Sequence, residues 1–487
     1  MISLVPVPIS VTLAAGPGFR FAPGVRLVTG STPGEISLGV IAADLVGRRV
    51  GFPIDLIMGA DVAGQVVLIA LDADAGPADA DVAERYRLTA TDGRIELLAP
   101  RLAGLVRGLA TLRQLIEPGP DGALTVPAIS IADAPRYSWR GLSLDVVRHF
   151  VTVEQVKSVL CVMTDFKLNV LHLHLTDDQG WRIQLPSRPL LTELSAQSEV
   201  GGGPGGFYTG EEYAGLIAFA AARQITIVPE IDIPGHINAA LHAYGELTPT
   251  GEPAGVYAGI DVGFSRLHQD LPATSAFLAD VFGDLAAMTP GECVHIGGDE
   301  VTSVAPDHYE WFVRTAQDIL RDAGKTLVGW QEIAPVGLDP GAVVQYWDTR
   351  TSPEPIVAAA AAGARVLLSP GSKVYLDMKY DDSTVLGLDW AGRIELRDAY
   401  DWEPADLIPG LPADAIIGVE AALWTETITT NDELFSLLLP RLAAVAEVAW
   451  SAAGRRDWDD FRSRVAGQGG RWDDAGLAWY RSPQVDW

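Results

Sequence analysis

Cysteine is scarce in this chain of 487 residues. Cys161 and Cys293 are the only two, each lies inside an apolar segment, and neither has a neighbour at metal-ligand spacing. This argues against a disulfide-stabilised scaffold and against a cysteine-based zinc site. We expect both side chains to be buried free thiols.

Positive charge is also in short supply. The chain carries 35 Lys and Arg against 63 Asp and Glu, a formal net charge of −28. Such a surface repels phosphate backbones and anionic lipid headgroups, so neither nucleic acid nor a membrane is expected as a partner. No uninterrupted apolar run approaches the roughly 20 residues that span a bilayer. With 48% hydrophobic residues the chain can still build a large core, and we expect a soluble globular protein.

The first ten residues, MISLVPVPIS, do not have the features of a secretory leader. They lack its basic segment and its small-residue cleavage site. A cytoplasmic location is therefore expected. Secretion stays open, because a chain from which a leader had been removed would look the same, and the oligomeric state is unknown.

The first 136 residues differ from the rest in their pattern of apolar and polar residues. Residues 86–99 alternate apolar and polar side chains around an Asp92-Gly93 turn, which predicts a hairpin. Residues 101–117 have apolar side chains at intervals of three and four, which predicts a helix. Prolines then interrupt the pattern up to Pro135. We predict a small α+β domain over residues 1–136 and a second domain over residues 137–487.

Apolar strands alternate with helices beyond this boundary. Near-continuous apolar strands of this kind form a parallel sheet that is covered on both faces, and eight units in about 350 residues fit a (β/α)8 TIM barrel. A doubly wound open sheet is the alternative. The predicted strands are residues 141–146, 169–175, 225–232, 293–297, 326–330, 342–347, 365–369 and 416–421.

Carboxylates and aromatic residues follow these strands where each one ends. In a barrel all such ends open onto one face, which is where active sites lie. Indole planes pack against the C–H faces of a pyranose ring, and carboxylates accept hydrogen bonds from its hydroxyls, so a carbohydrate ligand is predicted. Any single tryptophan could instead be ordinary packing. The residues at these ends include Asp177, Asp232, His236, Asp299, Glu300, Trp330, Trp347, Tyr375, Asp377, Trp390, Trp424 and Glu426.

The adjacent carboxylates Asp299 and Glu300 predict glycoside cleavage. That reaction needs one carboxylic acid to protonate the leaving oxygen and one negative group to support a developing positive charge. Neighbours in an extended backbone point in different directions, which separates the two tasks. We expect Gly297 and Gly298 to let backbone and sugar approach closely, because they lack a Cβ atom. The alternative is an exposed acidic turn.

Several ordered motifs resemble one known family. HIGGDE, together with LHLHLTDDQGW, EIDIPGH, GGFYT, RGLSLDVVRHF, VYLD and LWTE, closely resembles the family 20 glycoside hydrolases, the β-N-acetylhexosaminidases, and above all their actinobacterial members. The likeness covers nearly the whole chain, including the small domain that precedes the barrel in this family. It implies an exo-acting hydrolase that needs no cofactor and removes terminal, non-reducing β-linked N-acetylglucosamine or N-acetylgalactosamine with retention.

The resemblance also implies a mechanism and a role for each site residue. The nucleophile is the substrate's own 2-acetamido oxygen, and an oxazolinium intermediate forms. Glu300 is then the general acid and later the base, while Asp299 orients the acetamido N–H. By the same matching, Tyr375 donates to the acetamido carbonyl, Asp377 supports Asp299, and a relay to Glu300 is formed by Asp177 and His236. Ring hydroxyls are held by Arg148 and Glu426. The acetamido pocket is walled by Trp330, Trp347 and Trp424, and Trp390 lies toward the aglycone.

Two other classes of function stay open at this point. His172 and His174 form an H-x-H pair on a strand, and with His236 and Asp299 they could build a metal-dependent amidohydrolase on the same barrel. We interpret the pair as structural, because it lies before the strand end. A sugar-binding module without catalysis is the other alternative, and Glu300 argues against it. The natural substrate could be chitobiose, chitin oligomers, peptidoglycan fragments or glycans.

Overall fold

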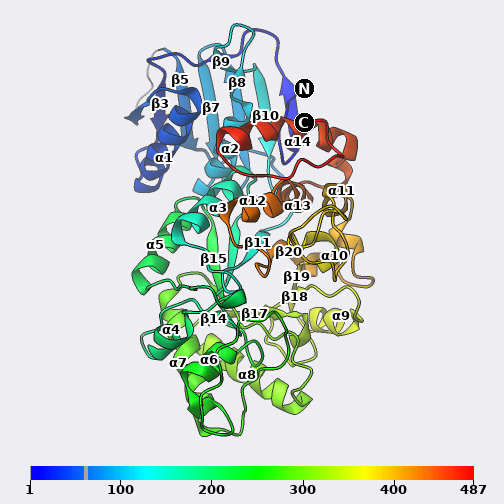
Figure 1. Ribbon diagram of the computed structural model, residues 1–487. Helices are drawn as coiled ribbons and strands as arrows, with labels where there is room; N and C mark the ends of the chain where they lie inside the picture. Colours follow the sequence, from blue (N-terminus) through cyan, green and yellow to red (C-terminus); the bar gives the residue numbers. More distant parts are fainter. Residues whose placement is uncertain (1, 60–63) are drawn as a thin grey trace.

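The computed structural model describes residues 2–59 and 64–487, and its amino-terminal part is built on a mixed sheet (Figure 1). Among the described residues the strands of this sheet lie in the order β1-β10-β6-β7-β5-β3-β4. The predicted hairpin is present, since β6 and β7 pair antiparallel around Asp92-Gly93. The strands are β1 (Ser10–Leu13), β3 (Arg26–Thr29), β4 (Asp55–Met58), β5 (Val66–Leu71), β6 (Tyr86–Thr91), β7 (Arg94–Ala99) and β10 (Ile129–Asp133), and a smaller sheet holds β2 (Phe19–Arg20), β8 (Glu117–Pro118) and β9 (Leu124–Val126).

Two helices, α1 (Pro33–Val50) and α2 (Leu102–Leu115), cover this sheet. Helix α1 begins at a capping box, in which the Thr32 side chain accepts from the Glu35 backbone N–H and Glu35 accepts from Thr32. Helix α2 is present as predicted, but it is buried on nearly all sides and not on one face alone, and its buried residues include Arg107, Thr111 and Gln114.

The second part of the chain is a closed parallel barrel. Its strands pair in the order β11-β12-β15-β16-β17-β18-β19-β20, and β20 pairs with β11 to close the ring. All the strands predicted for the second domain are present, and closure rules out the open-sheet alternative. They are β11 (Trp139–Asp145), β12 (Val170–His174), β15 (Thr226–Glu230), β16 (Cys293–His295), β17 (Thr326–Trp330), β18 (Val343–Tyr346), β19 (Arg365–Leu368) and β20 (Ile416–Leu423).

Helices surround the barrel, and a short β13 (Thr176–Asp177) and β14 (Gly180–Trp181) hairpin follows β12. The Thr in the GGFYT motif has a local task, because Thr209 caps α5 by accepting from the Glu212 backbone N–H. The helices are α3 (Val153–Asp165), α4 (Leu190–Ser195), α5 (Gly210–Ala221), α6 (Asn238–Ala243), α7 (Pro272–Met288), α8 (Pro306–Asp322), α9 (Glu354–Ala361), α10 (Gly371–Val374), α11 (Leu396–Tyr400), α12 (Asn431–Leu438), α13 (Arg441–Trp450) and α14 (Trp458–Asp474).

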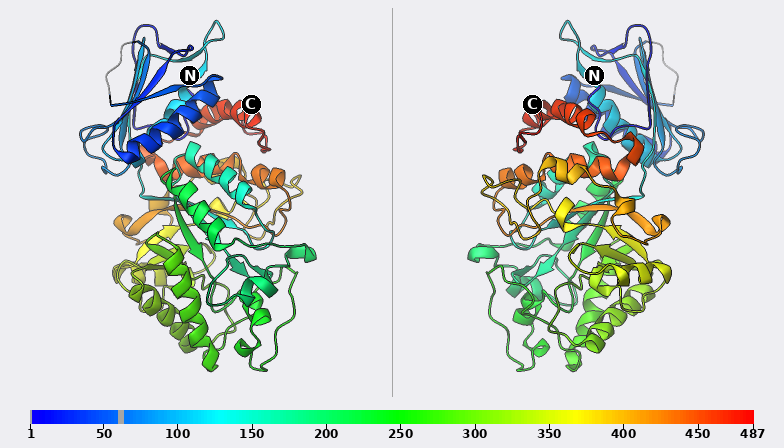
Figure 2. Two further views of the ribbon diagram at one scale, coloured as in Figure 1. Left: turned by 90° about the vertical axis from the view of Figure 1, so that its left-hand side faces the viewer. Right: turned by 90° about the vertical axis from the view of Figure 1, so that its right-hand side faces the viewer.

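The carboxyl-terminal helix α14 joins the two parts. Figure 2 shows it lying between the amino-terminal sheet and the barrel helices. Arg471 on α14 donates to the Arg113 carbonyl at 3.0 Å, and Arg464 pairs with Glu447 on α13 at 2.6 Å. Residues after the barrel therefore hold the first domain in place. The boundary at residue 136 stays a prediction.

One prediction about the cysteines is wrong. Cys161 is exposed and Cys293 is half-buried, although both are free. Helix α3 turns its Val159, Leu160 and Met163 side chains inward, which leaves position 161 on the outer face. No helix in the described part of the chain is long and apolar enough to cross a membrane.

Candidate active site

A cavity of about 330 Å³ opens where the barrel strands end. All of the predicted site residues line it except Trp330 and Asp377. The lining residues that were predicted are Arg148, Asp177, His236, Asp299, Glu300, Trp347, Tyr375, Trp390, Trp424 and Glu426, and the others are His174, Asp232, Ile260, Val262, Arg350 and Leu388.

A larger cavity of about 720 Å³ lies at the opposite end of the barrel, beside the amino-terminal domain. Its buried Glu84 carboxylate is clamped by Arg107 and Arg140, each at 2.7 Å. Burial opposes the ionisation of Glu84, but Arg140 and Arg107 outweigh it and lower its pKa to about 2, so this carboxylate is no candidate acid.

Asp299 and Glu300 both face the smaller cavity, in the turn that follows β16. The prediction that they sit in extended backbone is wrong, because Glu300 has a left-handed φ of 55°. Non-glycine residues in this region carry a strain of about 1 kcal/mol or more, and such positions cluster at functional sites. The turn brings the second carboxylate back into the cavity, where the Glu300 side chain is 35% exposed and that of Asp299 is 15% exposed.

Gly297 and Gly298 serve a purpose that differs from the predicted one. A Cβ on Gly297 would lie 1.8 Å from Asp232 Oδ1, and a Cβ on Gly298 would lie 2.8 Å from the Tyr309 hydroxyl. Both glycines also have a positive φ, at 67° and 105°. The space they leave is therefore filled by neighbouring protein side chains, and it does not serve the approach of a sugar.

Asp232 is a site residue that the sequence prediction left without a role. Its Oδ1 accepts the Gly298 backbone N–H at 2.9 Å, and its carboxyl is hydrogen-bonded to Asp299. Burial and the Asp299 charge raise the pKa of Asp232 well above its usual range. The pair therefore holds a proton on Asp232, which leaves Asp299 able to act as the negative partner.

Asp177 and His236 connect to Glu300 as predicted. His236 Nδ1 lies 3.2 Å from Asp177 Oδ1, and its Nε2 lies 3.4 Å from Glu300 Oε2. Burial alone lowers the pKa of an imidazole, but the Asp177 carboxylate and Glu300 raise that of His236 well above its usual range. Asp177 is also bound by Arg148 at 2.7 Å. Arg148 and His236 outweigh the effect of burial and hold the pKa of Asp177 far below its usual range.

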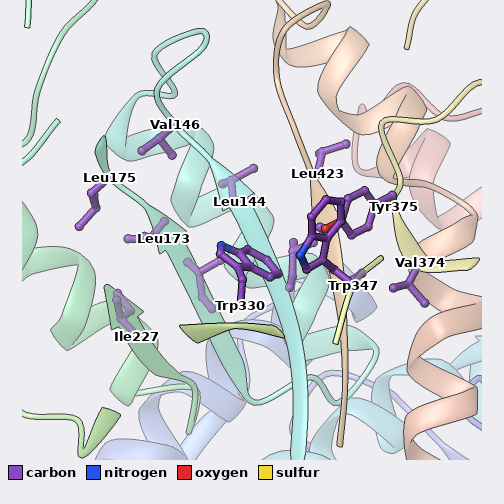
Figure 3. Packing of buried hydrophobic residues seen from close by; sticks show 14 of the residues in the cluster. Leu144, Val146, Leu173, Leu175, Ile227, Trp330, Trp347, Val374, Tyr375 and Leu423 are labelled. Atoms are coloured by element: carbon purple, nitrogen blue, oxygen red, sulfur yellow. The ribbon is translucent and has the colours of Figure 1, made fainter. Parts of the chain in front are cut away.

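Aromatic rings form another part of the cavity wall. Trp347 lies parallel to Tyr375 with ring centroids 6.4 Å apart, and Figure 3 shows the two side by side. Trp390 meets both rings edge-on, and Trp424 lies 6.2 Å from Tyr375. Flat apolar faces of this kind suit the C–H faces of a sugar ring.

The placement of Trp330 in the pocket wall needs correction. Its indole is 1% exposed and packs 6.0 Å behind Trp424, so it supports the wall from inside the barrel. The indole N–H donates to Glu230 at 2.8 Å, which fixes the ring away from the cavity.

The predicted contact between Asp377 and Asp299 also needs correction. Asp299 is hydrogen-bonded to Asp232, whereas Asp377 interacts with Glu426 and with the Trp424 backbone. Burial and the Glu426 charge raise the pKa of Asp377 well above its usual range. Both Asp377 oxygens are buried, and neither has a hydrogen-bond partner among the described side chains.

Glu332 is a further residue that sequence reasoning missed. Its Oε2 accepts the Trp347 indole N–H at 3.1 Å. Burial and the nearby Asp299 raise the pKa of Glu332 to about 8. Glu332 directly follows the β17 strand end, and that position was the available signal.

The arrangement of donor atoms bears on the metal alternative. Among the described residues, the groups with metal-like spacing are His172, Glu230 and His295; Asp177, Asp178 and His236; and Asp232, His236 and Asp299. The proposed set of His172, His174, His236 and Asp299 is not among them. Both ring nitrogens of His174 already contact carboxylates, Glu230 at 2.6 Å and Asp177 at 3.0 Å.

Comparisons with known proteins agree with this site. Residues 137–309 and 303–453 match the catalytic domain of glycosyl hydrolase family 20, and residues 1–134 match domain 2 of that family. The chain is 57% identical over 486 residues to a β-N-acetylhexosaminidase of Cellulomonas fimi, an alignment that covers 100% of this chain and 97% of that protein.

Solved structures are similar as well. The Streptomyces plicatus N-acetyl-β-hexosaminidase in complex with Thio-NAglucal superposes with a TM-score of 0.95 at 42% identity, covering 100% of this chain and 98% of that one. A mutant of that enzyme in complex with its product GlcNAc gives a TM-score of 0.94 at 42% identity and the same coverage.

Proposed function

The chain belongs to glycosyl hydrolase family 20 and is a β-N-acetylhexosaminidase, and we propose how its cavity residues divide the catalytic work. It hydrolyses terminal non-reducing β-linked N-acetylhexosamine with retention, by substrate-assisted catalysis. In our assignment Glu300 is the acid and base, and Asp299 is the negative group beside the acetamido nitrogen.

In the first step the acetamido carbonyl oxygen attacks C1 and the bond from C1 to the leaving oxygen breaks. Glu300 donates its proton to that oxygen. Asp299 accepts a hydrogen bond from the acetamido N–H while positive charge develops on the oxazolinium ring. The proton held by Asp232 keeps the charge on Asp299.

In the second step Glu300, now a carboxylate, takes a proton from a water molecule as that water attacks C1. The bond from C1 to the acetamido oxygen breaks, so the original configuration at C1 is restored. His236 lies 3.4 Å from Glu300 and acts as its hydrogen-bond partner in both protonation states.

The other lining residues position the sugar. Tyr375 donates its hydroxyl to the acetamido oxygen, because burial and the surrounding carboxylates raise the pKa of its phenol far above the usual range and keep it protonated. Arg148 and Glu426 bind ring hydroxyls. Charged hydrogen bonds of this kind contribute about 1.5–3 kcal/mol each.

One observation carries this proposal: Asp299 and Glu300 open into the same indole-walled cavity of about 330 Å³. That volume is at the small end of the ~300–1,000 Å³ range of ligand sites, so it suits a single terminal sugar better than the interior of a polymer. Exo-action follows from this size.

We propose chitooligosaccharides and related N-acetylhexosaminides as the substrate class. The GlcNAc product bound by the Streptomyces plicatus mutant supports N-acetylglucosamine at the non-reducing end. At the mouth of the cavity, the 40% exposed Trp390 and the 52% exposed Ile260 offer apolar surface to a second sugar.

The test of the acid is Glu300→Gln, assayed on a methyl and a 4-nitrophenyl β-N-acetylglucosaminide. We expect the methyl glycoside to lose ~10²–10⁴-fold in kcat/KM, because methoxide leaves poorly without a proton, and the nitrophenyl glycoside to lose much less. Glu354→Gln, an exposed glutamate on α9, serves as the matched control. Equal losses on both substrates would remove Glu300 from the role of acid.

A further inference from the structure

A row of buried ionisable side chains runs from the active site into the barrel interior. Beyond Asp177 come His174, Glu230, His172 and Glu420, joined by contacts of 3.0, 2.6, 3.0 and 2.9 Å. Each is at most 1% exposed. They lie on or next to the strands β12, β15 and β20, and of these five residues only Asp177 contacts His236, the partner of Glu300.

Geometry fixes the charge of His174. Its Nδ1 lies 2.6 Å from Glu230 and its Nε2 lies 3.0 Å from Asp177. An ionised carboxylate only accepts hydrogen bonds, so both ring nitrogens must donate and the ring is an imidazolium cation. Burial alone would lower the pKa of His174, but the two carboxylates outweigh it and raise the value to about 10.

The next histidine along the row also lies between two carboxylates. His172 Nδ1 lies 2.9 Å from Glu420 and its Nε2 lies 3.0 Å from Glu230. Glu230 and Glu420 overcome the effect of burial and raise the pKa of His172 to about 9. Carboxylates and imidazolium cations therefore alternate along the row, and every charge has a neighbour of opposite sign.

The active-site end of this row is Asp177, which faces three cations. His174, His236 and Arg148 all contact its carboxylate, at 3.0, 3.2 and 2.7 Å. Arg148 is shared with Asp145 and faces the sugar, so it is not free to hold Asp177 alone. His174 contacts Asp177 through Nε2 and is anchored through Nδ1 by Glu230, a residue of the barrel interior.

We infer that His174, held by Glu230, is a positioning residue of the reaction. It fixes the orientation and charge of Asp177 and, through His236, the proton shared with Glu300. This inference rests on the proposed role of Glu300 as acid and base.

Other polar and charged groups also face the row, and they bear on its pH dependence. In the barrel interior, His295 and Trp330 face Glu230, and Trp139 and Gln345 face Glu420. At the active-site end, Arg148 and Asp178 face Asp177, and Asp232 and Asp299 face His236. Glu300 is faced by Asp299, Glu332 and Arg350.

One of these groups provides a matched control. His295 is as buried as His174 and lies 3.0 Å from the same Glu230. Its Nδ1 lies 3.0 Å from both Glu230 and the Gly297 backbone nitrogen, its Nε2 has no hydrogen-bond partner, and burial lowers the pKa of His295, which favours the neutral ring. Replacing it disturbs packing at Glu230 without removing a cation.

The experiment compares His174→Gln with wild type in kcat/KM against pH, on the methyl and the 4-nitrophenyl β-N-acetylglucosaminide. Losing a cation favours the protonated form of nearby carboxyls, so we expect the alkaline limb to move up by about one pH unit. We expect kcat/KM on the methyl glycoside to fall by about 10-fold, which is part of the ~10²–10⁴-fold effect of general acid catalysis, and kcat/KM on the nitrophenyl glycoside to fall less.

His295→Gln should leave the alkaline limb where it is in wild type. Circular dichroism checks folding, and His174→Asn, which keeps a donor toward Glu230, is measured in parallel and should shift the limb in the same direction. An unshifted limb with equal losses on both substrates in the folded variants would overturn the inference. Glu300→Gln is measured alongside. If it retains wild-type activity on the methyl glycoside, the assignment of Glu300 as the acid fails. If it loses that activity as expected but the pH limb of the His174 variants is unshifted, only the positioning role of His174 is refuted.

Discussion

At the scale of single residues, the proton between Asp232 and Asp299 decides which carboxyl is charged. Asp232 accepts from the Gly298 backbone with one oxygen, and its pKa is raised more strongly than that of Asp299. The more strongly raised pKa of Asp232 means that the shared proton favours Asp232 over Asp299. A neutral side chain of the same shape at position 232 should therefore preserve most of the activity.

We predict that Asp232→Asn keeps kcat within about 10-fold of wild type at neutral pH. The amide oxygen can still accept from Gly298, and the amide N–H can donate to Asp299. Asp299→Asn should lose about 10²–10³-fold, because it removes the charge that stabilises the oxazolinium ion. Steady-state kinetics on an aryl β-N-acetylglucosaminide measures both, and a larger loss for Asp232→Asn than for Asp299→Asn would contradict the assignment.

Sequence reasoning found the residues of this site that follow strand ends in a motif. It could not assign a role to Asp232 or Glu332. The role of Asp232 depends on the proton it holds, and that of Glu332 on a contact with Trp347, and only the fold brings these about. It placed Trp330 in the wall because position at a strand end does not say whether a side chain points into the cavity or into the barrel.

At the scale of elements, the turn after β16 is the most constrained part of the site. Gly297, Gly298 and Glu300 all have a positive φ, and His236, which contacts Glu300, has a φ of 51°. Apolar strands with polar ends were predictable from their pattern, since burial on both faces demands it. The left-handed turn was not, because a pair of glycines permits many conformations.

We predict that Gly297→Ala lowers kcat/KM strongly, because the added Cβ would lie 1.8 Å from Asp232 Oδ1 and must displace it. The matched control is Gly324→Ala, where φ is 73° and nothing lies within 4 Å of the added carbon. The control should cost about 1 kcal/mol in stability from backbone strain and leave activity unchanged. Thermal unfolding and kinetics separate the two effects, and equal activity in both variants would refute the packing role of Gly297.

At the scale of the whole molecule, the two ends of the barrel have different tasks. The amino-terminal domain docks at the end opposite the cavity, where Lys167 pairs with Asp133 at 2.9 Å and Trp450 donates to the same carboxylate. The formal net charge of −28 disfavours anionic partners. The reaction is confined to one small cavity, and the substrate must bring its own nucleophile into it.

The claim that the substrate brings its own nucleophile is tested most directly by wild-type kcat/KM on paired 4-nitrophenyl β-glycosides that differ only at the 2-position. An intramolecular nucleophile raises the rate through its high effective concentration, so we predict that the 2-acetamido glucoside is hydrolysed at least about 10³-fold faster than the 2-hydroxy glucoside. Comparable rates on the two would contradict the account.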